Sequence, residues 1–272
     1  MLPESVRMKQ NRKSYIRSDK TAQIGIGTLI IFIAMVLVAA VAGAVLIQTS
    51  GVLQQKAQST GNQATKETSS NLQIKEIEGI RAKTSATNMS LTVDLLRINV
   101  GLNAGSEPVD LSQVIVSISD GTTTNELVYA DEDKAGVGTM DYYYTNGTLT
   151  NHLRALTMRG DPTPNIPHFF IAEKVRDEDG SFTQKNPTIN TGDLVDLYVG
   201  TVSEDATAFK YLYLVDTTGG SGGAAPLKAS GFTISPRTEL RIILTPEYGA
   251  SATADMVMPS TYGSVENLKL YP

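Results

Sequence analysis

The apolar residues of this chain follow two different patterns, and the first is a single uninterrupted run. Residues 24–47 carry no charge, and hydrophobic side chains fall on every face of a helix, so no amphipathic stripe can be drawn. At a rise of about 1.5 Å per residue, this helix would extend about 36 Å, enough to cross a bilayer. Such a helix is stable only where lipid or other helices surround it.

The run continues into a polar stretch that is rich in helix-forming residues. A thin apolar stripe persists there at helical spacing, formed by Val52, Leu53, Ala57, Ala64 and Thr68. Gly51 and Gly61 weaken this part by about 1 kcal/mol each. We therefore expect one long helix over residues 23–72.

Beyond residue 72 the second pattern is an alternation with a period of two, which is typical of strands. Strands are expected at 73–77, 91–99, 109–119, 126–130, 169–175, 194–202, 210–215, 239–245, 254–258 and 265–270. Turn signals such as Asp120-Gly121 and Asp179-Gly180 separate them. The pattern predicts an antiparallel, immunoglobulin-like β-sandwich over residues 73–272, and therefore an α+β chain with a long N-terminal helix.

Charge is divided unevenly between the two ends of the chain. Residues 1–22 hold six basic and two acidic residues, a net charge of +4. Of the 23 basic and 28 acidic residues in total, 17 and 26 remain, so the rest of the chain carries −9. Because basic flanks stay cytoplasmic, the acidic part is expected outside the membrane, and its charge disfavours a nucleic-acid partner. Residues 1–22 are interpreted as a basic leader.

A second mode of processing is also compatible with the sequence. Ala40-Val41-Ala42 is a small-x-small triplet inside the apolar run, so ordinary signal-peptide removal would leave Gly43 as the first residue. The run is long for such a signal.

The residues that most often carry catalysis are scarce. The chain has no cysteine and two histidines, His152 and His168, which lack a partner at motif spacing and are expected at a surface or interface. A P-loop, a GxSxG elbow and an HExxH motif are absent from the sequence. We therefore expect neither an enzyme nor a cofactor.

A recognisable pattern is formed by QIGIGTLIIFIAMVLVAAVA at 23–42 and LIQTSGVLQQKA at 46–57, and it extends through QATKETSS at 63–70 and IKEIEG at 74–79. These segments resemble the N-terminal part of archaellins, the archaeal flagellins of the type IV pilin-like superfamily. Weaker similarity follows at 175–181, 236–240 and 259–262. Gly27 stands where bacterial type IV pilins usually carry Glu, which favours an archaellin.

This resemblance implies a class III, prepilin-type leader that a prepilin peptidase removes. Mapped onto this chain, cleavage falls between Ala22 and Gln23, with Ala22 where the family usually has Gly. Gly25 then occupies the third mature position, as the family pattern leads one to expect.

The resemblance further implies a structural subunit of the archaellum filament, which drives swimming. Its partners would be copies of itself or sister archaellins, a membrane assembly platform and a motor ATPase; the precursor would lie in the cytoplasmic membrane and the product in an extracellular surface filament. The expected polymerisation core comprises Ile24, Ile26, Leu29, Ile30, Phe32, Ile33, Val36, Leu37, Ala40, Val41, Ala44 and Val45. An adhesion pilin, or a single-pass protein presenting a binding β-domain, remains an alternative.

Several smaller motifs are candidates for modification or binding. Asn88-Met-Ser90 and Asn146-Gly-Thr148 are N-glycosylation sequons. The acidic clusters at 131–133 and 177–179, above all Asp177 and Asp179, offer oxygen ligands for Ca²⁺, although solvated acidic turns are the favoured interpretation, and we expect no metal. The tyrosine run at 142–144 suits either a subunit interface or the core.

Overall fold

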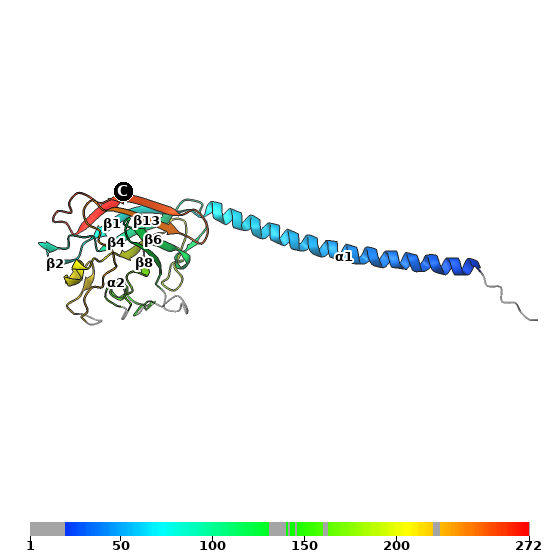
Figure 1. The fold of residues 1–272 in the computed structure, drawn as a ribbon, viewed down its shortest axis with the longest axis horizontal. Coiled ribbons are helices and arrows are strands. Elements are labelled where there is room, and N and C mark those ends of the chain that lie inside the picture. Colours follow the sequence, from blue (N-terminus) through cyan, green and yellow to red (C-terminus); the bar gives the residue numbers. More distant parts are fainter. Residues whose placement is uncertain are drawn as a thin grey trace, which may run out of the picture. The chain divides into compact units, whose positions relative to one another are not determined.

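The computed structural model describes residues 20–130, 140, 142–144, 146–159, 163–219 and 224–271, with side chains from Ile24 onward. The chain divides into two compact units, residues 1–61 and residues 62–272. The first unit is formed by the helix α1, which runs from Lys20 to Ser69 and enters the second unit with its last residues. Figure 1 shows α1 in blue to cyan and the strands of the second unit in cyan to red.

The expected long helix is confirmed, and it ends three residues before the predicted boundary at 72. Residues 1–19 of the predicted leader lie outside the described part of the chain, and residues 20–22 belong to the first turn of α1.

The second unit is built on a nine-stranded sheet with the strand order β14-β13-β6-β7-β8-β10-β4-β1-β15. All neighbouring pairs are antiparallel except β7 and β8, which run parallel. The nine strands are β1 (Leu72–Ile80), β4 (Leu95–Leu102), β6 (Ile115–Ser119), β7 (Thr124–Tyr129), β8 (Phe169–Arg176), β10 (Leu194–Gly200), β13 (Glu239–Thr245), β14 (Ala252–Val257) and β15 (Asn267–Tyr271). The predicted antiparallel β-domain is thus confirmed.

Shorter elements complete this unit. A four-stranded sheet has the order β12-β11-β2-β3, and β5 pairs with β9. Their bounds are β2 (Lys83–Ser85), β3 (Asn88–Met89), β5 (Val109–Asp110), β9 (Thr188–Ile189), β11 (Tyr211–Leu212) and β12 (Val215–Asp216). The helix α2 spans Leu149–Met158, and single 3₁₀ turns span Leu111–Gln113 and Asp205–Ala208.

The large sheet is rolled, because its end strand β14 contacts both β1 and β15. Every one of the nine strands contributes to the apolar cluster inside this roll, which we call the inner core. Alternate residues point the other way. In β8, Phe170 and Ala172 enter the inner core, whereas Phe169 and Ile171 join a second cluster, the outer core, which α2, β11 and β12 cover.

The structure differs from the predicted elements, apart from shifted strand ends and the unpredicted short strands β2, β3 and β9, in three places. The strand expected over 109–119 is interrupted, because the Asp110 carboxylate accepts a hydrogen bond from Ser112 N (2.9 Å) and caps a 3₁₀ turn. The strand expected over 210–215 is the short hairpin β11–β12, which reverses at Tyr213 with a positive φ of 54°. The helix α2 was not predicted; its Leu149, Leu153 and Leu156 lie on one helical face against the outer core.

Candidate polymerisation helix and surface sites

The twelve predicted core residues of α1 are all exposed in the isolated chain. Among the larger ones the exposed fraction of the residue runs from 49% at Ile33 to 67% at Ile24. Leu29, Ile30, Ile31 and Phe32 are consecutive and all more than half exposed, so the apolar surface surrounds the helix completely. Within the described residues, α1 is the one helix long and apolar enough to cross a membrane.

The polar side chains of this segment are satisfied within the helix itself. Thr28, the single hydroxyl residue between positions 24 and 47, donates through Oγ1 to the Gly25 carbonyl at 2.9 Å. Just beyond the segment, Thr49 donates to the Val45 carbonyl, also at 2.9 Å. The segment therefore requires nothing polar from its surroundings and can be buried among lipids or other helices.

The predicted processing site falls near the start of α1. Ala22 and Gln23 lie in α1, but their side chains are outside the described part of the chain. Cleavage between them stays a prediction.

The two sequons differ in how accessible their hydroxyl residue is. Asn88 is exposed, but Ser90 is only 2% exposed, and its Oγ lies 2.7 Å from Thr92 Oγ1 in a buried polar network. Asn146 is exposed, and so is Thr148, whose side chain makes no capping hydrogen bond at the start of α2. The second sequon is therefore open on both of its key residues.

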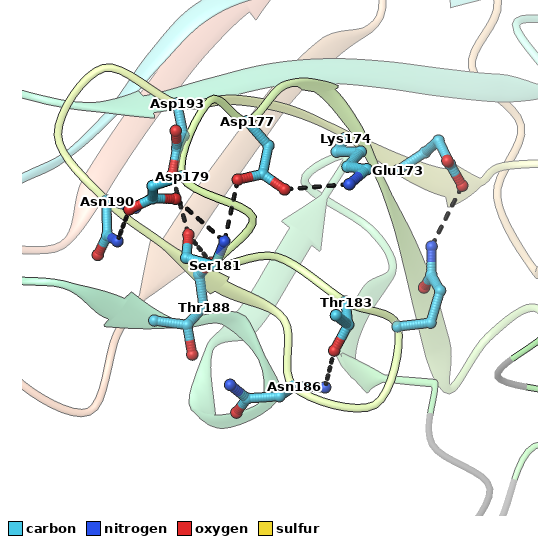
Figure 2. A network of polar contacts seen from close by, with 11 residues as sticks. Glu173, Lys174, Asp177, Asp179, Ser181, Thr183, Asn186, Thr188, Asn190 and Asp193 are labelled. Atoms are coloured by element: carbon cyan, nitrogen blue, oxygen red, sulfur yellow. Dashed lines mark hydrogen bonds and ion pairs between the residues drawn. The ribbon is translucent and has the colours of Figure 1, made fainter.

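Three carboxylates gather at the loop after β8. Figure 2 shows Asp177 and Asp179 beside Asp193, and one carboxylate oxygen of each lies within 4.8 Å of the others. Asp193, which precedes β10 and is only 6% exposed, was not predicted because it lies outside the local acidic cluster at 177–179.

Protein donors already serve this acidic cluster. Ser181 N donates to Asp177 (3.1 Å) and to Asp179 (3.0 Å), and Asn190 Nδ2 donates to Asp179 (2.6 Å). These bonds, with that from Asn190 first, lower the pKa of Asp179. Such a turn is held together by hydrogen bonds, and its oxygens are of the kind that Ca²⁺ prefers. The cluster at 131–133 lies outside the described residues.

The histidines and tyrosines occupy mixed positions. His168 is exposed, as expected, but the expectation is wrong for His152, which lies in α2 with 2% exposure. Its ring packs 4.7 Å from that of the buried Tyr143, and Nε2 lies 2.8 Å from the Tyr144 carbonyl oxygen. Tyr142 and Tyr144 are exposed on either side of Tyr143, so the run serves the core at its centre and the surface at its ends.

Comparison with known proteins gives a consistent assignment. The family model described as archaeal-type flagellin matches residues 22–256. Flagellin B3 of Thermococcus kodakarensis is 37% identical over 89% of this chain and 95% of its own length, and flagellin B2 of Methanocaldococcus jannaschii is 34% identical over 92% and 94%. The solved archaeal flagellum of Methanospirillum hungatei shares the fold, with a TM-score of 0.52 at 15% identity over 91% of this chain and 99% of that one. The chain therefore belongs to the archaeal-type flagellin family, as a structural subunit of the extracellular archaeal flagellum filament.

Proposed function

We propose that this archaellin polymerises through residues 24–47 of α1, which pack against the same segment of neighbouring copies to form the filament core. The observation that carries the proposal is the apolar surface around the full circumference of the helix. Burying its roughly 15 large side chains is worth on the order of 20 to 45 kcal/mol relative to water, an upper bound because lipid already supplies most of it. The free energy of transfer from lipid into a bundle of identical helices is then nearly zero, and side-chain packing between the helices favours the bundle.

Small residues within the segment support close packing. Ala39, Ala40, Gly43 and Ala44 allow neighbouring backbones to approach. Because one helix face of a copy would meet a different face of the next, the contact is heterologous and does not close, which produces a helical filament rather than a ring. The second unit, residues 62–272, which we call the β-rich unit, would form the outer part of the filament.

Removal of the leader would release the helix from the membrane. With residues 1–22 attached, six basic side chains hold the N-terminal end at the cytoplasmic surface. A prepilin peptidase cutting after Ala22 would remove them, and the match of the family model from residue 22 onward supports this position. The family resemblance also supports a membrane assembly platform, a motor ATPase and sister archaellins as partners.

A charge placed in the apolar segment tests the packing. We expect Ala40→Glu to abolish filaments and leave the β-rich unit folded, because an unpaired carboxylate would enter the core. Gln55→Glu is the control, since it also introduces a carboxylate but falls at a polar, exposed position of the same helix. Electron microscopy of filaments sheared from cells gives the result. Normal filaments from Ala40→Glu, or none from Gln55→Glu, would refute the packing scheme.

A further inference from the structure

The N-terminal end of α1 offers no carboxylate to a positive charge. If the mature chain starts at Gln23, its α-amino group is followed by Ile24 and Ile26, both more than 60% exposed and available for packing. The hydroxyl of Thr28 is already directed to the Gly25 carbonyl. The first charged side chain along the helix is Lys56, which is also positive, and the first carboxylate is that of Glu67.

Neighbouring copies offer nothing better. In a filament of copies of this chain, any helix that packs its own residues 24–65 against this end brings no Asp or Glu. An ammonium ion buried in apolar surroundings without a partner is strongly disfavoured. It would also sit at the positive end of the helix macrodipole, which repels it further. The charge must therefore be removed or kept out of the core.

We infer that Gln23, once it becomes the first residue, cyclises to pyroglutamate and so enters the filament uncharged; this inference rests on the cleavage proposed above. The α-amino nitrogen attacks Cδ of the side-chain amide, a nitrogen–Cδ bond forms, and the bond from Cδ to Nε2 breaks. Ammonia leaves with Nε2 and a proton from the α-amino group. The reaction consumes no oxidant, reductant or water. The five-membered lactam keeps one amide N–H and has no basic nitrogen.

The mass of the N-terminal peptide tests the inference on native filaments. Sheared filaments are dissolved and digested with trypsin, which releases a peptide that ends at Lys56. We expect its mass to lie about 17 Da below that of the linear peptide 23–56, the mass of the lost ammonia. Edman degradation should give no sequence until pyroglutamyl aminopeptidase removes the lactam and exposes Ile24.

The alternative outcomes separate the two proposals. A peptide 23–56 at full mass with a free amine would overturn the cyclisation and leave the cleavage intact. A peptide that begins at Thr21, as an uncut leader would give, or a chain that starts at Gly43, would overturn the cleavage itself.

Two variants test why the charge matters. Gln23→Asn keeps an amide but would need a strained four-membered ring, so we expect a free amine and a loss of filaments from the cell surface. Gln23→Glu can lose water to give the same lactam, or it can keep a carboxylate that pairs with the α-amino group. In either case the N-terminal charge is neutralised, so we expect this variant to form filaments as the unchanged protein does. Equal filament yield from Gln23→Asn with a free amine would overturn the electrostatic argument.

Discussion

His152 lies inside the β-rich unit, where its ring has almost no contact with water. Desolvation by burial lowers its pKa, and only the bond to the Tyr144 carbonyl opposes the shift. The neutral ring is therefore the form that the folded chain prefers. Gly147 is held against the same ring, since a Cβ at this position would lie 2.7 Å from His152 Nε2.

This burial predicts a loss of stability in acid. The unfolded chain binds a proton at His152 near pH 6.5, and the folded chain only at lower pH, so the free energy of unfolding falls as pH decreases below 6.5. The slope approaches about 1.4 kcal/mol per pH unit until the folded pKa is reached. We expect His152→Phe, which keeps a ring beside Tyr143, to lack this contribution when melting temperatures are compared between pH 7.5 and 5.

The pH dependence of the unchanged protein alone would not isolate His152, because the buried Asp94 also changes stability with pH. It is fully buried, and desolvation raises its pKa, so its protonation on acidification stabilises the fold and opposes the effect of His152. Both proteins contain Asp94, and its contribution cancels in their difference. Identical pH profiles for the two proteins would show that the His152 ring is not the group responsible.

The sequons give a second prediction at the scale of single residues. A modifying enzyme must reach both the asparagine and the hydroxyl two positions later, and Ser90 is buried whereas Thr148 is exposed. We expect Asn146→Gln and Thr148→Val each to remove a glycan from the subunit, and Asn88→Gln to leave the glycan mass unchanged. Intact mass of purified subunits measures this. A glycan lost in Asn88→Gln would mean that modification precedes folding of this region.

At the scale of secondary-structure elements, the last turn of α1, which belongs to the β-rich unit, packs against the loop between β13 and β14. The Lys66 ammonium lies 5.6 Å from the centre of the Tyr248 ring, and Asn71 forms an isolated β-bridge with Ala250. Gly249 adopts a positive φ of 98° there, and a Cβ on it would lie 2.2 Å from the Ser70 carbonyl oxygen. Both the backbone conformation and the contact require glycine.

Substitution of this glycine should separate strain from steric overlap. Gly249→Ala incurs both, and we expect it to lower the free energy of unfolding by about 3 kcal/mol or more. Gly231→Ala is the control, because its φ of 87° is similar but nothing lies within 4 Å of the added Cβ; its cost should be about 1 to 2 kcal/mol. Chemical denaturation of the two variants measures the difference. Equal losses would show that the contact with Ser70 relaxes freely.

Elements were predictable from the sequence where one local pattern decided the outcome. The uninterrupted apolar run fixed α1, and strict alternation placed β13 at its observed bounds, Glu239–Thr245. Prediction failed where a side chain or a tertiary contact competed with the pattern, as where Asp110 caps a turn inside an otherwise strand-like stretch. The sequence of α2 does contain a helix signal, because Leu149, Leu153 and Leu156 follow Thr148 at helical spacing. This short signal was overlooked in a region where the other patterns indicate strands.

The candidate sites divide in the same way. The proposed polymerisation segment consists of consecutive residues, so its apolar character is visible directly in the sequence. Asp193 joins Asp177 and Asp179 only because the chain returns to β8 through β9 and β10, which no local spacing reveals. The buried network around Ser90 likewise depends on a remote residue, because Thr92 Oγ1 lies 2.7 Å from Ser90 Oγ and 2.8 Å from Ser203 Oγ.

At the scale of the whole molecule, the folding cores and the proposed polymerisation segment lie in different parts of the chain. Every residue of the inner and outer cores lies at or beyond Leu72, so among the described residues α1 contributes nothing to either. Conversely, the predicted polymerisation residues all lie before residue 62, within the other compact unit. The subunit can therefore lose the proposed polymerisation segment without losing a residue of either core.

This division predicts the behaviour of a fragment consisting of residues 62–272. It keeps the last turns of α1 with the Lys66–Tyr248 contact, so we expect it to be monomeric, to unfold cooperatively and to form no filaments. Light scattering after size exclusion gives its mass, and circular dichroism its melting. Its melting temperature should match that of the β-rich unit in detergent-solubilised Ala40→Glu, because both retain the same two cores. A fragment that aggregates or unfolds would show that residues before 62 stabilise the second unit, and filaments from the fragment would locate assembly in the β-rich unit instead of α1.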